Sequence, residues 1–260
     1  MIRIRNGFML HAKNKKLTMN NLSLAIYSHS SYYDCLMPCL DRFNRYCKYE
    51  FEHKFLLLDQ ADSFDGYDVL RYTDTECYTA RLVETVSQIP TDYLLFLHED
   101  MILYEGVSKT YMNLAVEAIM EDDIDCIKLI KCDDNFLEAP YKNSRFLKTI
   151  PTTANLLFAV QPTLWNKESY INVLKANPDK NIWQLEGSGQ GYAKENGYNC
   201  LYTYDQFLDK KRGKYHYDSC VFPYIATAIV KGKWNITDYP KEMREMLEEY
   251  EIDPNVRGIR

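Results

Sequence analysis

Apolar, strand-forming runs alternate with helical stretches through the first hundred residues, and this alternation constrains the fold more than any other feature of the chain. The runs at 22–28, 51–59 and 92–100 are rich in Leu, Ile, Phe and Tyr. The stretches at 33–47 and 77–89 place apolar residues at helical spacing. Strands that alternate with helices favour an α/β fold with a mixed, mostly parallel sheet and helices on both faces.

The composition is that of a packed globular protein. The chain has 260 residues, of which 46% are hydrophobic, and its 22 Tyr and 11 Phe outnumber its 9 Pro and 10 Gly. Such a chain can bury a substantial core and is not expected to be disordered. We expect one domain over 21–260, preceded by a basic, poorly ordered extension over 1–20. A basic amphipathic anchor or a transit-like segment is the alternative for the extension.

The charges and cysteines exclude several function classes. The chain carries 31 basic and 37 acidic residues, a net charge of -6, which gives no general attraction to nucleic acid. Its eight cysteines form no CxxC pair and no zinc-finger spacing, so free thiols in a reducing compartment are expected. No apolar run approaches the roughly 20 residues of a transmembrane helix. These features predict a cytoplasmic protein and leave peripheral membrane association open.

Polar side chains follow two of the predicted strands where each strand ends. Asp59 closes the second strand, and His98, Glu99 and Asp100 close the third. In an open α/β sheet the ligand crevice lies beyond the carboxyl ends of the strands, so these groups should share one rim. Neighbouring carboxylates repel each other and favour a cation beside them. Hard oxygen ligands suit Mn²⁺ or Mg²⁺, and we expect one of these ions at this rim.

The strand that ends in His98-Glu99-Asp100 resembles that of the GT-A glycosyltransferases, whose DxD-type motif ends a core strand and holds a metal on the diphosphate of a nucleotide sugar. Because a histidine occupies the first position, the resemblance assigns the metal most firmly to Asp100. It assigns a metal role less firmly to His98, and a metal or donor role to Glu99. Family members often bring a late histidine or aspartate back to the metal, which nominates His216 or Asp218.

The stretch 161–191 adds a second point of resemblance. An apolar segment with Trp165 precedes a helix, and a W-x-x-E segment follows from Trp183 to Glu186, before several glycines. In many inverting sugar transferases an acidic residue of this part takes the proton of the attacking hydroxyl. The resemblance implies that Glu186 is this base and that Trp165 and Trp183 bind the acceptor. Core packing of the tryptophans, and a helix-start carboxylate that binds backbone amides, are the alternatives.

The same resemblance implies a nucleotide-sugar donor site along the first strands. Ser28, His29 and Ser30 would lie beneath the nucleotide. Asp59 would accept a hydrogen bond from the base or the ribose. Arg81 would face the diphosphate, and an ordinary solvated helix arginine is its alternative.

The resemblance covers about residues 20–240 as an order of elements. It implies a GT-A-like, Rossmann-like fold with a donor-binding part over about 21–105 and an acceptor-binding part over about 106–260. The predicted reaction moves a sugar from a nucleoside-diphosphate sugar to a hydroxyl of a glycan, lipid or glycoprotein, with inversion and a divalent metal. A nucleotidyltransferase with the same carboxylate rim is one alternative, although the chain has no P-loop or GxGxxG motif. An inactive descendant that binds carbohydrate or nucleotide sugar is the other.

Overall fold

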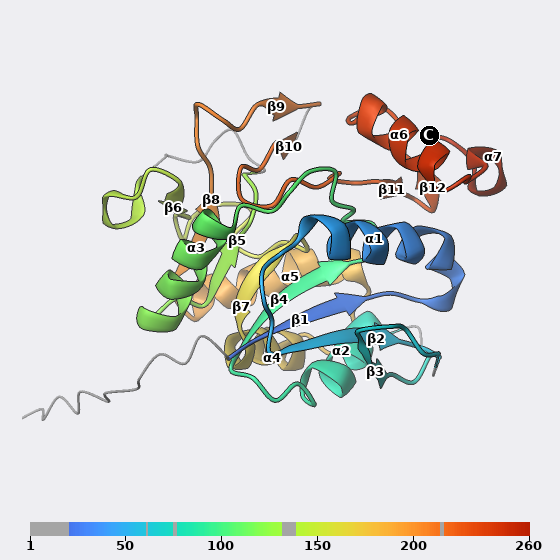
Figure 1. The fold of residues 1–260 in the computed structure, drawn as a ribbon. Coiled ribbons are helices and arrows are strands. Elements are labelled where there is room, and N and C mark those ends of the chain that lie inside the picture. Colours follow the sequence, from blue (N-terminus) through green and yellow to red (C-terminus); the bar gives the residue numbers. More distant parts are fainter. Residues whose placement is uncertain (1–20, 61, 75–76, 132–138, 214–215) are drawn as a thin grey trace, which may run out of the picture.

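A mixed eight-stranded sheet with helices on both faces forms the centre of the protein (Figure 1). The structure is a computed structural model that describes residues 21–260 apart from 61, 75–76, 132–138 and 214–215. The predicted basic extension over 1–20 lies outside the described residues. In the part of the chain that is described, no helix combines the length and the apolar character needed to cross a membrane.

The strands of the sheet are β1 (Leu22–Tyr27), β2 (His53–Leu58), β3 (Asp68–Arg71), β4 (Tyr93–His98), β5 (Cys126–Lys128), β6 (Leu147–Thr149), β7 (Thr163–Asn166) and β8 (Cys200–Thr203). They lie in the order β3-β2-β1-β4-β7-β5-β8-β6. β1, β2, β3 and β4 pair in parallel, as do β5 and β8, whereas β7 and β6 run antiparallel to their neighbours. The sheet is therefore mixed and mostly parallel, which confirms the predicted fold class.

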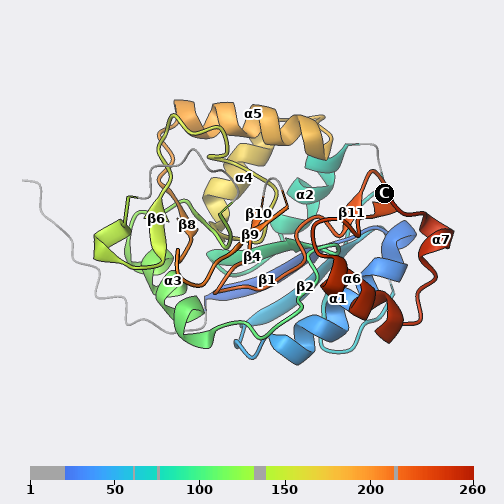
Figure 2. The same ribbon diagram turned by 90° about the horizontal axis from the view of Figure 1, so that it is seen from above.

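Helices cover both faces of this sheet, as the view from above in Figure 2 also shows. The helices are α1 (Tyr33–Tyr46), α2 (Tyr78–Val86), α3 (Lys109–Glu121), α4 (Lys167–Ala176), α5 (Ile182–Glu195), α6 (Pro240–Glu249) and α7 (Pro254–Arg257), with short 3-10 turns η1 (Ser30–Tyr32) and η2 (Tyr141–Asn143). Apolar residues of α1, α3 and α6 pack into one core, and those of α2, α4 and α5 pack into the other. The two cores lie on opposite faces of the sheet.

The central strands are apolar throughout because both of their faces are covered. All six residues of β1 are buried, and β4 is buried from Leu94 to His98. Successive side chains of a strand point to opposite faces. Leu95 and Leu97 accordingly pack into the core of α1, whereas Leu94 and Phe96 pack into the core of α2. The continuous apolar runs in the sequence are thus those of strands buried on both sides.

The antiparallel strand β7 brings a later part of the chain to the carboxyl end of β4. In the register of the two strands, Phe96 lies opposite Thr163 and Tyr93 lies opposite Asn166. The residues that precede Thr163 therefore continue past the end of β4, toward Asp100. The α5 helix packs against α4, which follows β7 directly. This connection joins the two polar segments that the sequence analysis selected, 98–100 and 183–186.

Short ribbons and the last helices complete the same edge. The ribbon strands are β9 (Lys211–Arg212) with β10 (His216–Tyr217), and β11 (Ile229–Val230) with β12 (Lys233–Trp234). Tyr224 forms a bridge with Leu103, and the Ile225 N–H donates to the Ile102 carbonyl at 2.8 Å. The segment at 224–225 is thereby held beside the residues that follow β4.

Gly189 allows α5 to pack closely against its neighbours. A Cβ atom at this position would lie 3.1 Å from side-chain atoms of both Phe158 and Val173, whereas one at Gly191 would meet nothing within 4 Å. The W-x-x-E segment continues as a helix through these glycines. Gly189 therefore sets the distance between α5 and the loop before β7.

A valine at Gly189 should weaken the fold, whereas the same change at Gly191 should not. Overpacking of this kind typically costs about 1–3 kcal/mol. We expect the Gly189→Val variant to lose that much free energy of unfolding in urea titrations. Gly191→Val, in the same helix but facing open space, is the matched control. Equal effects of the two substitutions would contradict the close packing.

Candidate active site

A pocket of about 630 Å³ opens at the carboxyl end of the central strands. Its wall includes five residues that the sequence analysis selected, namely His98, Asp100, Trp183, Glu186 and His216. These residues come from the end of β4, from the first turns of α5 and from β10. The fold therefore brings together the proposed metal ligands, the proposed base and one of the proposed acceptor-binding tryptophans.

Asp100 follows β4 and lies half-buried in this pocket. Burial raises the pKa of its carboxyl group to about 6, although hydrogen bonds from its own backbone and from that of Ile229 in β11 favour the charged form. A carboxylate in such a place is stabilised by a positive charge beside it. Asp100 is thus well placed to bind a cation that enters the pocket.

His98 is buried next to Asp100 and is neutral. Its Nε2 atom lies 2.7 Å from the hydroxyl of Tyr78, and the rings of Tyr27, Tyr78 and Phe96 surround it. Burial lowers its pKa to about 3. Because Tyr78 occupies Nε2, the Nδ1 atom is the ring nitrogen that a metal could take.

Glu99 does not line the pocket. Its side chain is buried, and among the described residues its Oε2 atom has no hydrogen-bond partner. Burial, with the neighbouring charge of Asp100, raises its pKa well above the ordinary value. The Cys35 thiol, on α1, donates to the Glu99 carbonyl at 3.4 Å. The main chain at Glu99 is therefore in contact with α1.

Trp183 and Glu186 lie three residues apart near the start of α5, so they share one face of the helix. Both line the pocket, and the Trp183 residue is 70% exposed. The Oε1 atom of Glu186 accepts the Val160 N–H at 2.9 Å. Burial raises the pKa of Glu186, so its proton affinity is higher than that of an ordinary glutamate. The amide that Glu186 binds belongs to the loop before β7. Asn181, and not Glu186, caps the start of α5, so Glu186 is not the helix-start carboxylate of the alternative interpretation.

His216 reaches the pocket from β10, whereas Asp218 does not line it. The Nδ1 atom of His216 is buried and has no hydrogen-bond partner among the described residues. Burial lowers its pKa, although the charge of Asp238 opposes this shift. The Oδ1 atom of Asp218 instead accepts from the Tyr104 hydroxyl at 2.8 Å and from Arg212 Nε at 2.7 Å. Of the two late candidates, only His216 is placed to meet a ligand.

Trp165 lies in the core and not in the pocket. It is 2% exposed, it stacks on Tyr170 with 4.9 Å between ring centroids, and it contacts Phe158. It is not among the residues that line the pocket. Its position is that of the core aromatic residue that the sequence left as the alternative.

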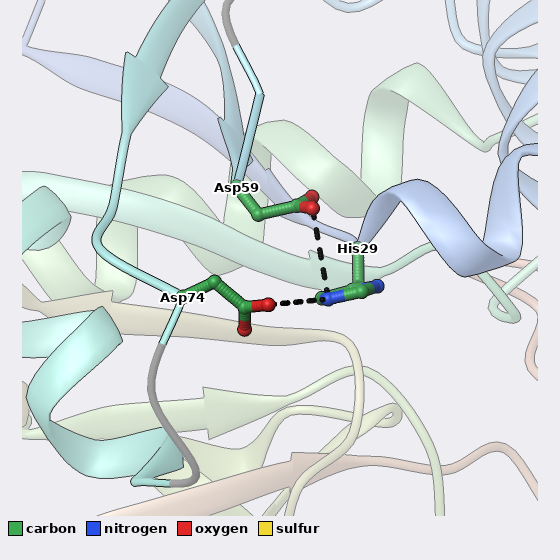
Figure 3. Close-up of side chains that lie close together, drawn as sticks. All are labelled: His29, Asp59 and Asp74. Atoms are coloured by element: carbon green, nitrogen blue, oxygen red, sulfur yellow. Dashed lines mark ion pairs between the residues drawn. The ribbon is translucent and has the colours of Figure 1, made fainter.

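A second polar cluster lies at the ends of β1, β2 and β3. Figure 3 shows His29 between two carboxylates, with its Nε2 atom 3.6 Å from Asp59 and 3.4 Å from Asp74. The Nδ1 atom of His29 accepts the Ser31 N–H at 3.0 Å, which leaves Nε2 to face the carboxylates. The ligand atoms of the three residues lie close enough together to hold a metal ion. Asp74 was not selected from the sequence.

The remaining proposed donor residues join this cluster. Ser30 donates to the Asp59 carboxylate from its N–H at 2.7 Å and from its hydroxyl at 2.6 Å. Burial opposes ionisation of Asp59, but these bonds outweigh it, and the pKa of Asp59 lies below its ordinary value. Ser28 is fully buried, and its carbonyl accepts from Tyr72.

Arg81 connects this cluster with the wall of the pocket. Its guanidinium pairs with Asp74 at 2.7 Å and donates to the Tyr27 hydroxyl at 3.1 Å. The Tyr27 ring in turn contacts the His98 ring, with 5.4 Å between centroids. Arg81 is therefore fixed between the cluster and the pocket, which a freely solvated helix arginine would not be.

Several residues of the pocket carried no signal in the sequence. Asn235 and Asp238 line it, and the side-chain amide of Asn235 donates to Asp238 at 3.2 Å. Arg260 lines it too. These residues follow no periodic pattern and reach the pocket only because the end of the chain folds back beside β4.

No protein-family model and no curated protein matches the chain. Solved structures are similar to it at low sequence identity. CMP:2-keto-3-deoxy-manno-octonic acid synthetase, complexed with CTP, has a TM-score of 0.46 and 13% identity over 70% of this chain and 89% of its own. S. aureus TarS 1-349 has a TM-score of 0.45 and 13% identity over 76% and 59%. A mannosyltransferase from Pyrobaculum calidifontis, in complex with GDP-Man and Mn²⁺, has a TM-score of 0.46 and 10% identity over 72% and 55%.

The neutral state of His98 can be tested by nuclear magnetic resonance. Because burial holds its pKa near 3, the chemical shifts of the His98 ring should not change between pH 5 and 8. Tyr78→Phe removes the hydroxyl partner but keeps the ring buried, so the shifts should stay constant in that variant too. A titration of His98 with a midpoint inside this range would contradict the assignment.

Proposed function

We propose that the protein transfers a sugar from a nucleoside-diphosphate sugar to a hydroxyl group of an acceptor, with inversion at the anomeric carbon. The observation that carries this proposal is that Asp100, from the end of β4, and Glu186, from α5, line one pocket. Burial raises the pKa of both carboxyl groups, and the proposal assigns the cation to Asp100 and the proton of the acceptor to Glu186. A displacement that releases a diphosphate and a proton needs a positive charge beside the diphosphate and a base for the proton.

The charge of the pocket supports a metal. Asp100, Glu186 and Asp238 contribute carboxylates to its wall, and these alone would repel a diphosphate. Asp100, His98 and His216 line this pocket and offer the oxygen and nitrogen donors that a divalent ion such as Mn²⁺ takes, whereas among the described residues it is His29, Asp59 and Asp74 whose ligand atoms lie within 4.8 Å of one another. A bound Mn²⁺ or Mg²⁺ would offset the charge that grows on the leaving diphosphate. His29, Asp59 and Asp74 offer a second place for a cation, on the nucleoside side.

Glu186 is the base in this proposal. As the acceptor oxygen bonds to the anomeric carbon, its proton passes to the Glu186 carboxylate, and the bond to the diphosphate breaks with its electron pair on the departing oxygen. The Val160 N–H holds Oε1 in place and the other oxygen can take the proton. Trp183, one turn earlier on the same face, offers an exposed ring on which an acceptor sugar can stack.

The polar cluster around Asp59 is the proposed nucleoside site. The two hydrogen bonds from Ser30 keep the pKa of Asp59 below the ordinary range in spite of its burial, so the carboxylate stays charged and accepts hydrogen bonds. Base and ribose both present donors to such a group. Arg81, between Asp74 and Tyr27, lies on the path from this cluster to the pocket. The donor would then extend from Asp59 toward Asp100.

Nucleotidyl transfer and ligand binding without turnover are the competing functions. The loop after β1, residues 28–32, has no glycine, lysine or arginine with which to hold a triphosphate. The similar solved structures include both kinds of transferase and do not separate them. Release of nucleoside diphosphate from a nucleotide sugar supports glycosyl transfer, release of pyrophosphate supports nucleotidyl transfer, and binding without either product indicates an inactive protein.

Replacing the proposed base should remove transfer and spare donor binding. We expect Glu186→Gln to lower kcat by about 100-fold or more, because a general base typically contributes that much. The Kd of the donor, measured by calorimetry, should stay within about twofold. Glu195→Gln, at the exposed end of the same helix, is the control and should change neither quantity. Equal loss of donor binding and turnover would point to a structural role for Glu186.

Replacing the proposed metal ligand should remove the metal dependence of donor binding. In thermal-shift measurements with UDP-, GDP- and dTDP-linked hexoses, the wild type should be stabilised by donor with Mn²⁺ but not with a chelator. Asp100→Asn should show little stabilisation in either condition. Asp179→Asn, at an exposed turn outside the pocket, should behave as the wild type. Donor binding that is indifferent to the chelator would refute the metal assignment.

A further inference from the structure

The end of the chain delivers a cationic side chain to the pocket. Arg260 lines the pocket, and its backbone N–H donates to the Trp234 carbonyl at 2.9 Å. The Trp234 N–H donates to the Gly258 carbonyl at 3.0 Å, and Ile259 forms a parallel bridge with Trp234. Residues 258–260 thus form a short extended segment alongside β12. This pairing fixes the position of the Arg260 backbone.

Arg257 fastens this segment to the start of α1. Its Nε atom pairs with Asp34 at 2.8 Å, and its NH2 group donates to the Ser31 carbonyl at 3.2 Å. Its guanidinium lies 4.6 Å from the centroid of Tyr32 and 5.7 Å from that of Trp234. Ion pairing and stacking on two rings hold the side chain firmly. The contacts of Arg257, which lie outside the pocket, therefore help to set the position of Arg260.

Arg260 differs in charge from the rest of the wall. Among the described residues that line the pocket it is the sole lysine or arginine, and Asp100, Glu186 and Asp238 supply the acidic groups. Within the described chain its guanidinium forms no hydrogen bond and no ion pair, in contrast to Arg257 and Arg81. It is free to bind an anionic group of a ligand.

We propose that Arg260 binds the phosphoanhydride of the donor and stabilises the charge of the leaving diphosphate. This inference rests on the proposed function. A guanidinium presents two parallel N–H donors that match two oxygens of a phosphate. Arg260 stabilises the diphosphate after the bond to the sugar has broken, when its charge is greatest. Arg257 acts as a positioning residue for it.

Inorganic pyrophosphate with Mg²⁺ tests the inference without any sugar or base. In calorimetric titrations we expect Arg260→Gln to weaken binding by about tenfold or more, because hydrogen bonds between charged groups are lost. Arg260→Lys should lose less, since it keeps the charge and not the paired donors. Arg244→Gln, an exposed arginine of α6 that does not line this pocket, should bind as the wild type.

The positioning role of Arg257 has its own readout. Arg257→Gln should weaken pyrophosphate binding, and the Arg257→Gln, Arg260→Gln double variant should bind no more weakly than Arg260→Gln alone. Additive losses would overturn the positioning role. Circular dichroism of each variant at the titration temperature separates a local loss from unfolding.

The inference is overturned if the wild type does not bind pyrophosphate, or if Arg260→Gln binds it as tightly as the wild type. Failure of the proposed function gives a different result. In that case pyrophosphate binding depends on Arg260, yet no nucleotide sugar loses its sugar in the presence of the wild-type protein. The two results are measured separately, by calorimetry and by product release.

Discussion

The burial of β4 between β1 and β7 is the constraint on which the rest of the structure depends. Leu94, Leu95 and Leu97 are fully buried because helices cover both faces of the sheet. A strand buried in this way can carry polar side chains only where it ends, so His98 and Asp100 emerge together at one edge. Every other element of the candidate site is arranged around that edge.

The same burial sets the electrostatics of the site. Removing charged groups from water disfavours ionisation, which raises the pKa of Asp100 and Glu186 and lowers that of His98. A neutral imidazole can bind a metal, a glutamate with raised proton affinity can accept a proton, and an aspartate in this position gains from a cation. Burial thus shifts the pKa of all three groups by a single physical effect, in the directions that their proposed roles require.

The polar residues beside the pocket divide into those already satisfied and those left available. Asp59, Asp74 and Arg81 are bound to one another or to Ser30 and Tyr27, so they form a rigid network with defined orientations. The buried Nδ1 atom of His216 has no hydrogen-bond partner in the described chain, and Arg260 is exposed at the wall of the pocket. In the proposed function the rigid groups bind the nucleoside, and the unpartnered ones face the diphosphate.

The sequence by itself determined the local elements, and the tertiary structure decided which side chains meet. Periodicity located β1, β2, β4, α1 and α2 to within a few residues. A helix buried along one stripe and a strand buried on both faces each leave a short-range pattern of apolar residues in the sequence. It placed Asp100 correctly at a strand end for the same reason. It did not separate Trp165 from Trp183, which are 2% and 70% exposed, or His216 from Asp218. Those differences arise from the antiparallel insertion of β7 and from the return of the chain end along β12, and contacts between segments so far apart in sequence leave no periodic signal.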